Sequence, residues 1–189
     1  MRYGRSRFCE KYWPRYFQGR IDILIYMQIT ETVFGPKTYL AIKKSIAISQ
    51  ITDKDMYDQA GKKLGEYMAA HEIVPAGGWS VLYIKWDQAA QAAEIAIGFP
   101  IVGIDSTNDA EISIIDILAK NASMTTLMGP YSEVSPKLAT THPALMKHVG
   151  EKGFNTEGLE VFAVEEYATN PETESDPQKY VTNVYYLHN

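Results

Sequence analysis

Cysteine is nearly absent from the sequence, which has Cys9 and no other among its 189 residues. A single thiol excludes an internal disulfide and a metal cluster built from cysteines. Because secreted proteins of this size often depend on disulfides, the lack of them favours a reducing compartment. We therefore predict a cytoplasmic protein.

Other chemical signatures are missing as well. No apolar run has the length that a signal peptide or a membrane span needs, and no glycine loop of the kind that cradles phosphate is present. The four histidines, His71, His142, His148 and His188, show no metal-ligand spacing on one predicted element, so we expect them at the surface or at helix caps. These absences predict no metal, no cofactor and no membrane span.

Charge is unevenly distributed along the chain. Residues 1–20 hold six Arg and Lys against Glu10 alone, whereas the whole chain has a formal charge of −5, so the remainder carries −10. An acidic body disfavours nucleic acid as a partner and favours cations. We interpret residues 1–20 as a basic, poorly ordered extension. It is too short for a helix-turn-helix, so direct contact with nucleic acid is not expected.

Apolar periodicity predicts an α+β protein. In the first half, Thr52 and Asp55 mark the start of a helix that ends near His71. Extended patterns surround it at residues 21–29, 39–42, 79–86 and 93–102.

The second half repeats this order. Strand formers fill residues 114–128, and strands are predicted at 161–167 and 179–188. A helix ends at Gly153, and Pro143 either opens it or kinks a longer helix that begins near residues 135–136. Both halves thus read strand, helix, strand, strand at a displacement of roughly 80–85 residues, which indicates internal duplication. We predict one domain over 21–189, built from pseudo-symmetric repeats at about 21–105 and 110–189, with a concave ligand cleft at their junction.

One strand combines acids with apolar residues. In the run Val161–Pro171, side chains alternate between faces, so Glu165 shares a face with Val161 and Tyr167 while Glu166 points the other way. A carboxylate among aromatic side chains is costly unless a donor or cation meets it. The run therefore indicates either a pocket that expects a partner or a solvated pair of acids.

From about residue 21 onward, the chain resembles the GyrI-like family of effector-binding domains, found in AraC-type and multidrug-responsive regulators. The resemblance rests on the order and spacing of several segments: residues 75–77, 83–87, 94–100, 129–131, 150–153, 165–171 and 182–185. Two departures are Asn183, where the family usually has an acid, and the region of Tyr39, which lacks the Gly-Pro-Tyr pattern found at 129–131.

The resemblance implies a concave cleft lined by aromatic side chains, with a glutamate on the penultimate strand reaching into it. That glutamate falls on Glu165, the residue that strand alternation also selects. Burial would raise the pKa of Glu165, whereas a cation or a tyrosine donor would lower it. The predicted ligand-binding residues are Glu165, Tyr39, Tyr83, Trp86, Phe99, Tyr131, Tyr167 and Tyr185.

Three functions agree with such a cleft. The first is binding of amphipathic, cationic or aromatic small molecules, for effector sensing or sequestration. The second, implied by some family members, is hydrolysis of strained cyclopropane-type electrophiles, with Glu165 as general base assisted by Tyr131 or Tyr83. The third is a protein-interaction module that resembles a gyrase inhibitor.

Overall fold

A computed structural model describes residues 27–104, 106–169 and 172–189. The basic segment 1–20, Cys9 and most of the strand predicted at 21–29 lie outside these residues. Residues 27–29 lie in the described part and form no strand. The first described strand begins at Thr30.

Ten helices and strands make up the main framework of the described residues. They are β1 (Thr30–Phe34), β2 (Lys37–Ala47), α2 (Lys54–Ala70), β3 (Trp79–Asp87), β4 (Ala92–Ile101), β5 (Ile112–Ile117), β6 (Lys120–Met128), α3 (Tyr131–Lys152), β7 (Ala163–Tyr167) and β8 (Val181–His188). This content confirms the predicted α+β class. Two strands precede the helix in each half. In the first half the sequence indicated two extended segments there, of which 39–42 lies within β2. In the second half the single run predicted at 114–128 is divided into two strands, β5 and β6.

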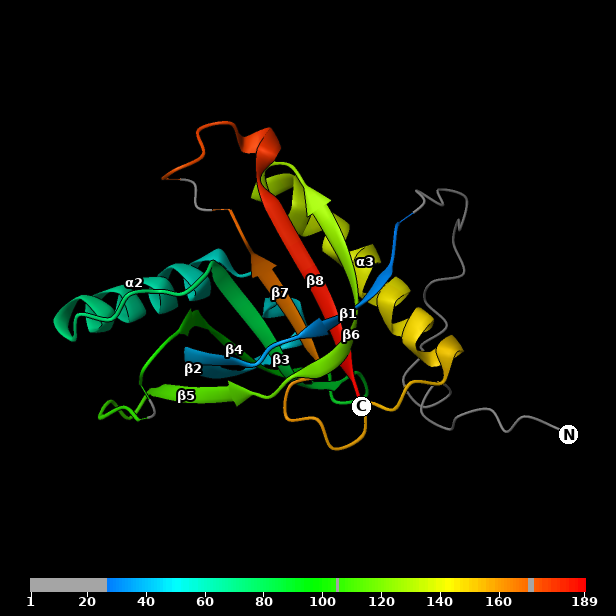
Figure 1. The fold of residues 1–189 in the computed structure, drawn as a ribbon, viewed down its shortest axis with the longest axis horizontal. Coiled ribbons are helices and arrows are strands. Elements are labelled where there is room, and N and C mark those ends of the chain that lie inside the picture. The colour runs from blue at the N-terminus through cyan, green and yellow to red at the C-terminus, as the bar shows by residue number, and fades with distance from the viewer. Residues whose placement is uncertain (1–26, 105, 170–171) are drawn as a thin grey trace, which may run out of the picture.

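The described strands form one antiparallel sheet in the order β1-β6-β8-β7-β3-β4-β2-β5 (Figure 1). The order is symmetric about the central pair β7 and β3. The first strand of each half is exchanged, since β1 pairs with β6 of the second half and β5 pairs with β2 of the first. This exchange interlocks the two halves.

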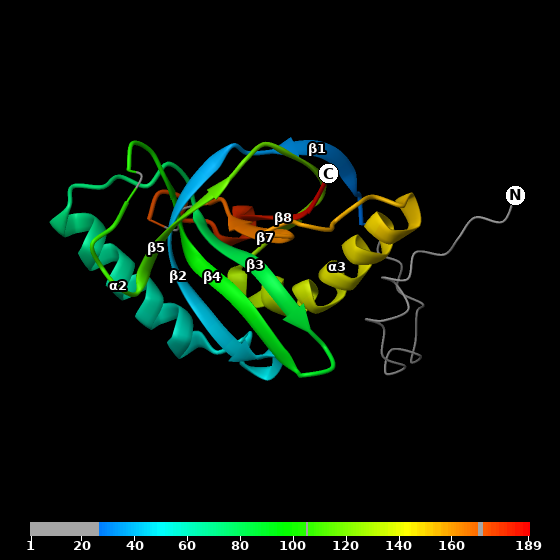
Figure 2. The same cartoon turned by 90° about the horizontal axis from the view of Figure 1, so that it is seen from below.

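Both helices lie on one side of the curved sheet (Figure 2). Helix α2 packs mainly on β4 and β2, while α3 packs mainly on β8 and β6. The central strands β3 and β7 therefore face the space between the helices. Buried side chains on the opposite face, including Phe34, Leu82 and Leu187, form a second core.

The helices follow from spacing and capping. Asp53 caps α2 by accepting a hydrogen bond from the backbone N–H of Asp55, in place of the predicted Thr52, and the C-cap is His71 as expected. Ala60, Leu64 and Met68 recur every four residues and form its buried stripe.

Helix α3 is the longer of the two alternatives predicted for this segment. It begins at Tyr131 and contains both Pro136 and Pro143 within its length. Gly153 ends it with a positive φ of 70°, the left-handed conformation that glycine adopts without steric cost.

Close backbone packing between β4 and β2 predicts a strong effect of Gly98→Ala. An added Cβ would lie 2.2 Å from the carbonyl oxygen of Leu40, so the strands would have to separate. We expect a loss of about 1–3 kcal/mol or more in the free energy of unfolding, measured by urea denaturation. Gly65→Ala in α2 is the matched control, since its Cβ meets nothing within 4 Å. It should stabilise by about 0.5–1 kcal/mol. Equal stability of Gly98→Ala and the wild type would contradict this reading of the packing.

Candidate functional site

Glu165 lies on β7, on the face of the sheet that the helices cover. Its register partners are Val81 on β3 and Val184 on β8, and the residue is 3% exposed. The prediction that alternation buries Glu165 on the same face as Tyr167 is confirmed. This carboxylate is the centre of the candidate site.

Within the described residues, three side chains donate hydrogen bonds to Glu165. The Tyr83 hydroxyl lies 2.5 Å and His142 Nε2 lies 2.6 Å from Oε1, and the Tyr167 hydroxyl lies 2.9 Å from Oε2. The donors come from β3, α3 and β7. The site thus draws side chains from both halves of the chain, as expected for a junction between repeats.

These donors determine the charge state of Glu165. Desolvation by burial is the largest single influence and raises the pKa, but the hydrogen bonds from His142, Tyr83 and Tyr167, with the charge of His142, outweigh it. The net pKa lies below the ordinary value of 4.5. Glu165 is therefore an ionised carboxylate at neutral pH.

The surrounding tyrosines remain protonated. Burial, followed by the negative charge of Glu165, raises the pKa of Tyr83, Tyr167 and Tyr186 well above its usual range. A phenol that keeps its proton remains a donor to the carboxylate. The cluster is thus one buried negative charge held by neutral hydroxyls and one imidazole.

A bulge in β3 adds an aromatic side chain to this face. The pairing of β3 with β4 shifts register between Tyr83 and Lys85, so Trp86 falls on the same face as Tyr83 despite the odd spacing. The two ring centroids are 6.2 Å apart. Tyr131 packs with its ring edge-on to that of Tyr167, at 5.0 Å between centroids.

A groove of about 420 Å³ lies beside the cluster. Tyr57, Trp79 and Phe99 provide its aromatic lining, and Trp79 meets Phe99 edge-on at 5.1 Å. Burial and then the charge of Glu165 raise the pKa of Tyr57, whose hydroxyl donates to the carbonyl of Ile51. Thr182, opposite Tyr167 in register, has a buried hydroxyl without a hydrogen-bond partner among the described residues.

The predicted ligand-binding residues do not all lie together. Tyr39 and Tyr185 lie on the opposite face of the sheet, next to Glu166. Glu166 is itself 9% exposed and pairs with Lys37 at 2.5 Å, so the idea that it is a solvated acid is wrong. The single cleft expected from the sequence is thus divided by the sheet into two environments.

His142 was expected at the surface or at a cap, and this was wrong. It lies one turn after Leu138 and three residues before Leu145, both of which are buried, so helical spacing already placed it on the inner side of α3. His148 faces Glu31 on β1, at 2.8 Å. The separation of six residues lets the two histidines meet glutamates on different strands.

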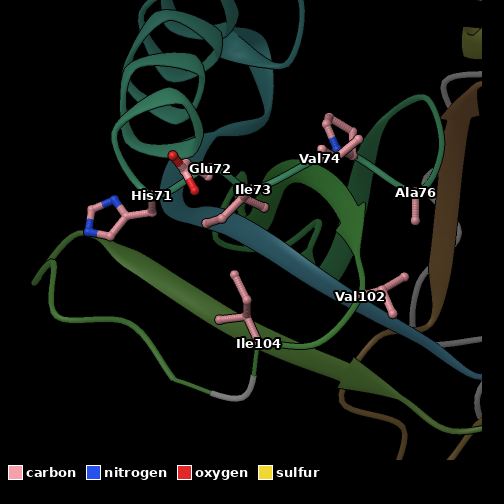
Figure 3. A pocket seen from close by; sticks show the side chains of 8 residues that line it. His71, Glu72, Ile73, Val74, Ala76, Val102 and Ile104 are labelled. Carbon is pink, nitrogen blue, oxygen red and sulfur yellow. The ribbon is translucent and has the colours of Figure 1, made fainter.

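A second groove, of about 520 Å³, lies at the C-terminal end of α2 (Figure 3). Its lining is mainly aliphatic, with Val74 and Val102 largely exposed and Glu72 as its carboxylate. It lacks convergent polar groups and lies away from Glu165, so we place the candidate site at the buried carboxylate. In the described residues, no group of three or more His, Cys, Asp or Glu is arranged to hold a metal ion.

No helix within the described ranges is both long and apolar enough to cross a lipid bilayer.

The sequence matches no protein-family model and no curated protein sequence. Solved structures with a similar fold include the C-terminal domain of EcmrR, with 16% identity and a TM-score of 0.60 over 86% of this chain and 98% of that one. EcmrR in a complex with DNA gives a TM-score of 0.65 and 14% identity over 85% of this chain, which spans 57% of that chain. SAV2435 bound to tetraphenylphosphonium gives a TM-score of 0.58 and 14% identity, over 86% of this chain and 94% of that one. This chain therefore shares the fold of these domains, an α+β arrangement consistent with the GyrI-like fold that the sequence indicated.

The depressed pKa of Glu165 predicts how stability depends on pH. A carboxyl whose pKa is lower in the folded state stabilises the fold above its ordinary value of 4.5, and this contribution is lost as pH falls through the folded value. Glu165→Gln should cost about 1–3 kcal/mol at neutral pH, because an amide group replaces an acceptor oxygen among three donors. Urea unfolding should show this cost shrinking as pH falls below the ordinary value of 4.5. Glu160→Gln, at an exposed pair with Lys43, is the control and should have little effect at any pH. A cost that stays constant with pH would argue against an ionised Glu165.

Proposed function

We propose that the protein binds amphipathic small molecules that carry a positive charge, at Glu165 between α2, α3 and the sheet. The observation that carries this proposal is one ionised carboxylate buried among hydroxyls and aromatic rings. Such a charge attracts a cation strongly, because little water screens it.

The aromatic side chains near Glu165 support a ligand that is both charged and apolar. Rings of Tyr83 and Tyr167 lie next to the carboxylate, and aromatic faces attract cations by roughly 0.5–2 kcal/mol each. The groove at Trp79 and Phe99 offers apolar area for the rest of the molecule. The free hydroxyl of Thr182 offers one further polar contact.

Binding agrees with this site better than hydrolysis does. A general base works best with a pKa near the operating pH, whereas the pKa of Glu165 lies below its ordinary value. Its three donors also occupy three of the roughly four lone-pair positions of the carboxylate, which leaves little capacity to activate water. The solved structure of SAV2435, which has this fold, holds tetraphenylphosphonium, a lipophilic cation, and this likeness supports the same ligand class here.

Tetraphenylphosphonium is a suitable probe, with tetraphenylborate as a control of matched shape and opposite charge. We expect titration calorimetry near neutral pH to detect binding of the cation and not of the anion. Glu165→Gln should weaken cation binding at least about tenfold, or about 1.4 kcal/mol.

Glu166→Gln is the matched variant, because Glu166 is the adjacent acid on the other face, paired with Lys37. It should bind the cation within about twofold of wild type, a change below about 0.5 kcal/mol. Equal binding of phosphonium and borate, or equal loss in both variants, would contradict a site at Glu165.

A further inference from the structure

His142 lies where a cationic ligand would have to contact Glu165. Its Nε2 is 2.6 Å from Oε1, and its side chain is 19% exposed, against 4% for that of Glu165. Solvent thus reaches the imidazole while the carboxylate beneath it is covered. A ligand that approaches Glu165 from this side meets His142 first.

The surroundings of the imidazole are those of a bound cation. Its ring centroid lies 4.9 Å from that of Tyr83 and 5.7 Å from that of Tyr186, both tilted by nearly 60°. Aromatic rings and one carboxylate form the kind of cage that binds organic cations. In this structure the imidazole of His142 occupies the position that an organic cation would take in such a cage.

Tyr186 permits His142 to change its charge without losing a partner. The Tyr186 hydroxyl lies 3.1 Å from Nδ1, and a hydroxyl both donates and accepts. It donates to a neutral ring that carries its proton on Nε2, and it accepts from Nδ1–H of imidazolium. Both states therefore fit the same geometry, and histidine is the side chain that changes charge between about pH 5 and 8.

The backbone of α3 is weakened at this point. Pro143 follows His142 directly and has no N–H to donate to the carbonyl of Ala139, four residues earlier. The Thr141 hydroxyl bonds back to the Lys137 carbonyl, a contact that often bends helices. A helix interrupted here can move the imidazole at lower cost than an unbroken one.

We infer that His142 is a resident and replaceable counter-ion of Glu165, which a cationic ligand displaces in order to bind. This inference rests on the proposed function and names the residue that governs selectivity at the site. Protonated His142 competes with the ligand, so affinity for a permanent cation falls as pH falls. Small hydrophilic cations, which gain no apolar contacts, fail to displace the imidazolium, whereas cations with apolar groups that also fill the groove succeed.

The other groups around His142 do not account for such a pH dependence. Glu165 and Tyr167 face it from β7, Tyr83 from β3 and Tyr186 from β8, while Tyr57 of α2 lies beyond the carboxylate. The tyrosines keep their protons, and Glu165 remains ionised across neutral pH. His142 is the remaining member of this cluster, and we assign the pH dependence of binding to it.

The experiment measures the Kd of tetraphenylphosphonium at about pH 5.5, 7 and 8.5, a range that brackets histidine titration. For wild type, we expect Kd to rise towards low pH, approaching tenfold per pH unit where one proton leaves on binding. His142→Gln should bind with a Kd that is independent of pH and, at the lowest pH, at least about tenfold tighter than wild type. His148→Gln is the matched control on the same helix and should keep the wild-type slope.

The outcomes separate the counter-ion from the site itself. If the Kd of wild type does not change with pH, or if the Kd of His142→Gln still rises towards low pH, His142 is not the counter-ion that the ligand displaces. The proposed binding site at Glu165 would then still stand. If only His142→Gln binds the cation, the proposal is supported, because this means that the imidazole of wild type blocks the cage. No binding by either protein at any pH overturns both. Should His142→Gln fail to fold, calorimetry of wild type at about pH 5.5 in acetate and in MES, two buffers with different ionisation enthalpies, gives the number of protons released. This number is expected to approach one and to be zero if the counter-ion is wrong.

Discussion

The buried carboxylate of Glu165 is the constraint around which the centre of the fold is arranged. A charge removed from water costs several kcal/mol unless donors or an opposite charge replace its hydration. Here the replacement comes from β3, β7 and α3, with β8 supporting the imidazole through Tyr186. These elements must keep their relative positions to within a hydrogen bond, since each lost donor leaves the charge less satisfied.

The exchange of first strands makes this arrangement possible. Because β1 pairs with β6 and β5 pairs with β2, each half completes the outer part of the other, and β3 and β7 become the centre of a continuous sheet. The crossing segments touch, since a Cβ on Gly35 would lie 3.1 Å from the carbonyl oxygen of Ile117. Each helix covers its own outer strands, and the central pair carries the polar residues that neither helix could bury against apolar side chains alone.

The sequence predicted the local features of this site and missed those set by distant pairing. Strand alternation identified Glu165, and periodicity with capping placed α2 closely, because these signals lie within a few residues. The assignment of Tyr185 and Tyr39 to the same cleft was wrong, because the face of each depends on the register of β8 and β2. A one-residue change of register reverses every side chain. His142 was missed for a related reason: its helical position was readable, but its partner lies 23 residues away on a strand.

Adjacent acids on β7 show why the two faces of the sheet differ in function. Glu166 is neutralised by Lys37, whose ammonium also lies over the Phe34 ring, 5.0 Å from its centroid. That pair is complete under all ordinary conditions, and a cation gains little by replacing it. Glu165 accepts hydrogen bonds from two tyrosine hydroxyls, which are uncharged and do not neutralise it. It also accepts one from the imidazole of His142, which neutralises the carboxylate only when the ring is protonated. A site that binds and releases a cation needs a carboxylate that the fold stabilises by hydrogen bonds but does not fully neutralise. Of these two neighbouring carboxylates, Glu165 meets that condition.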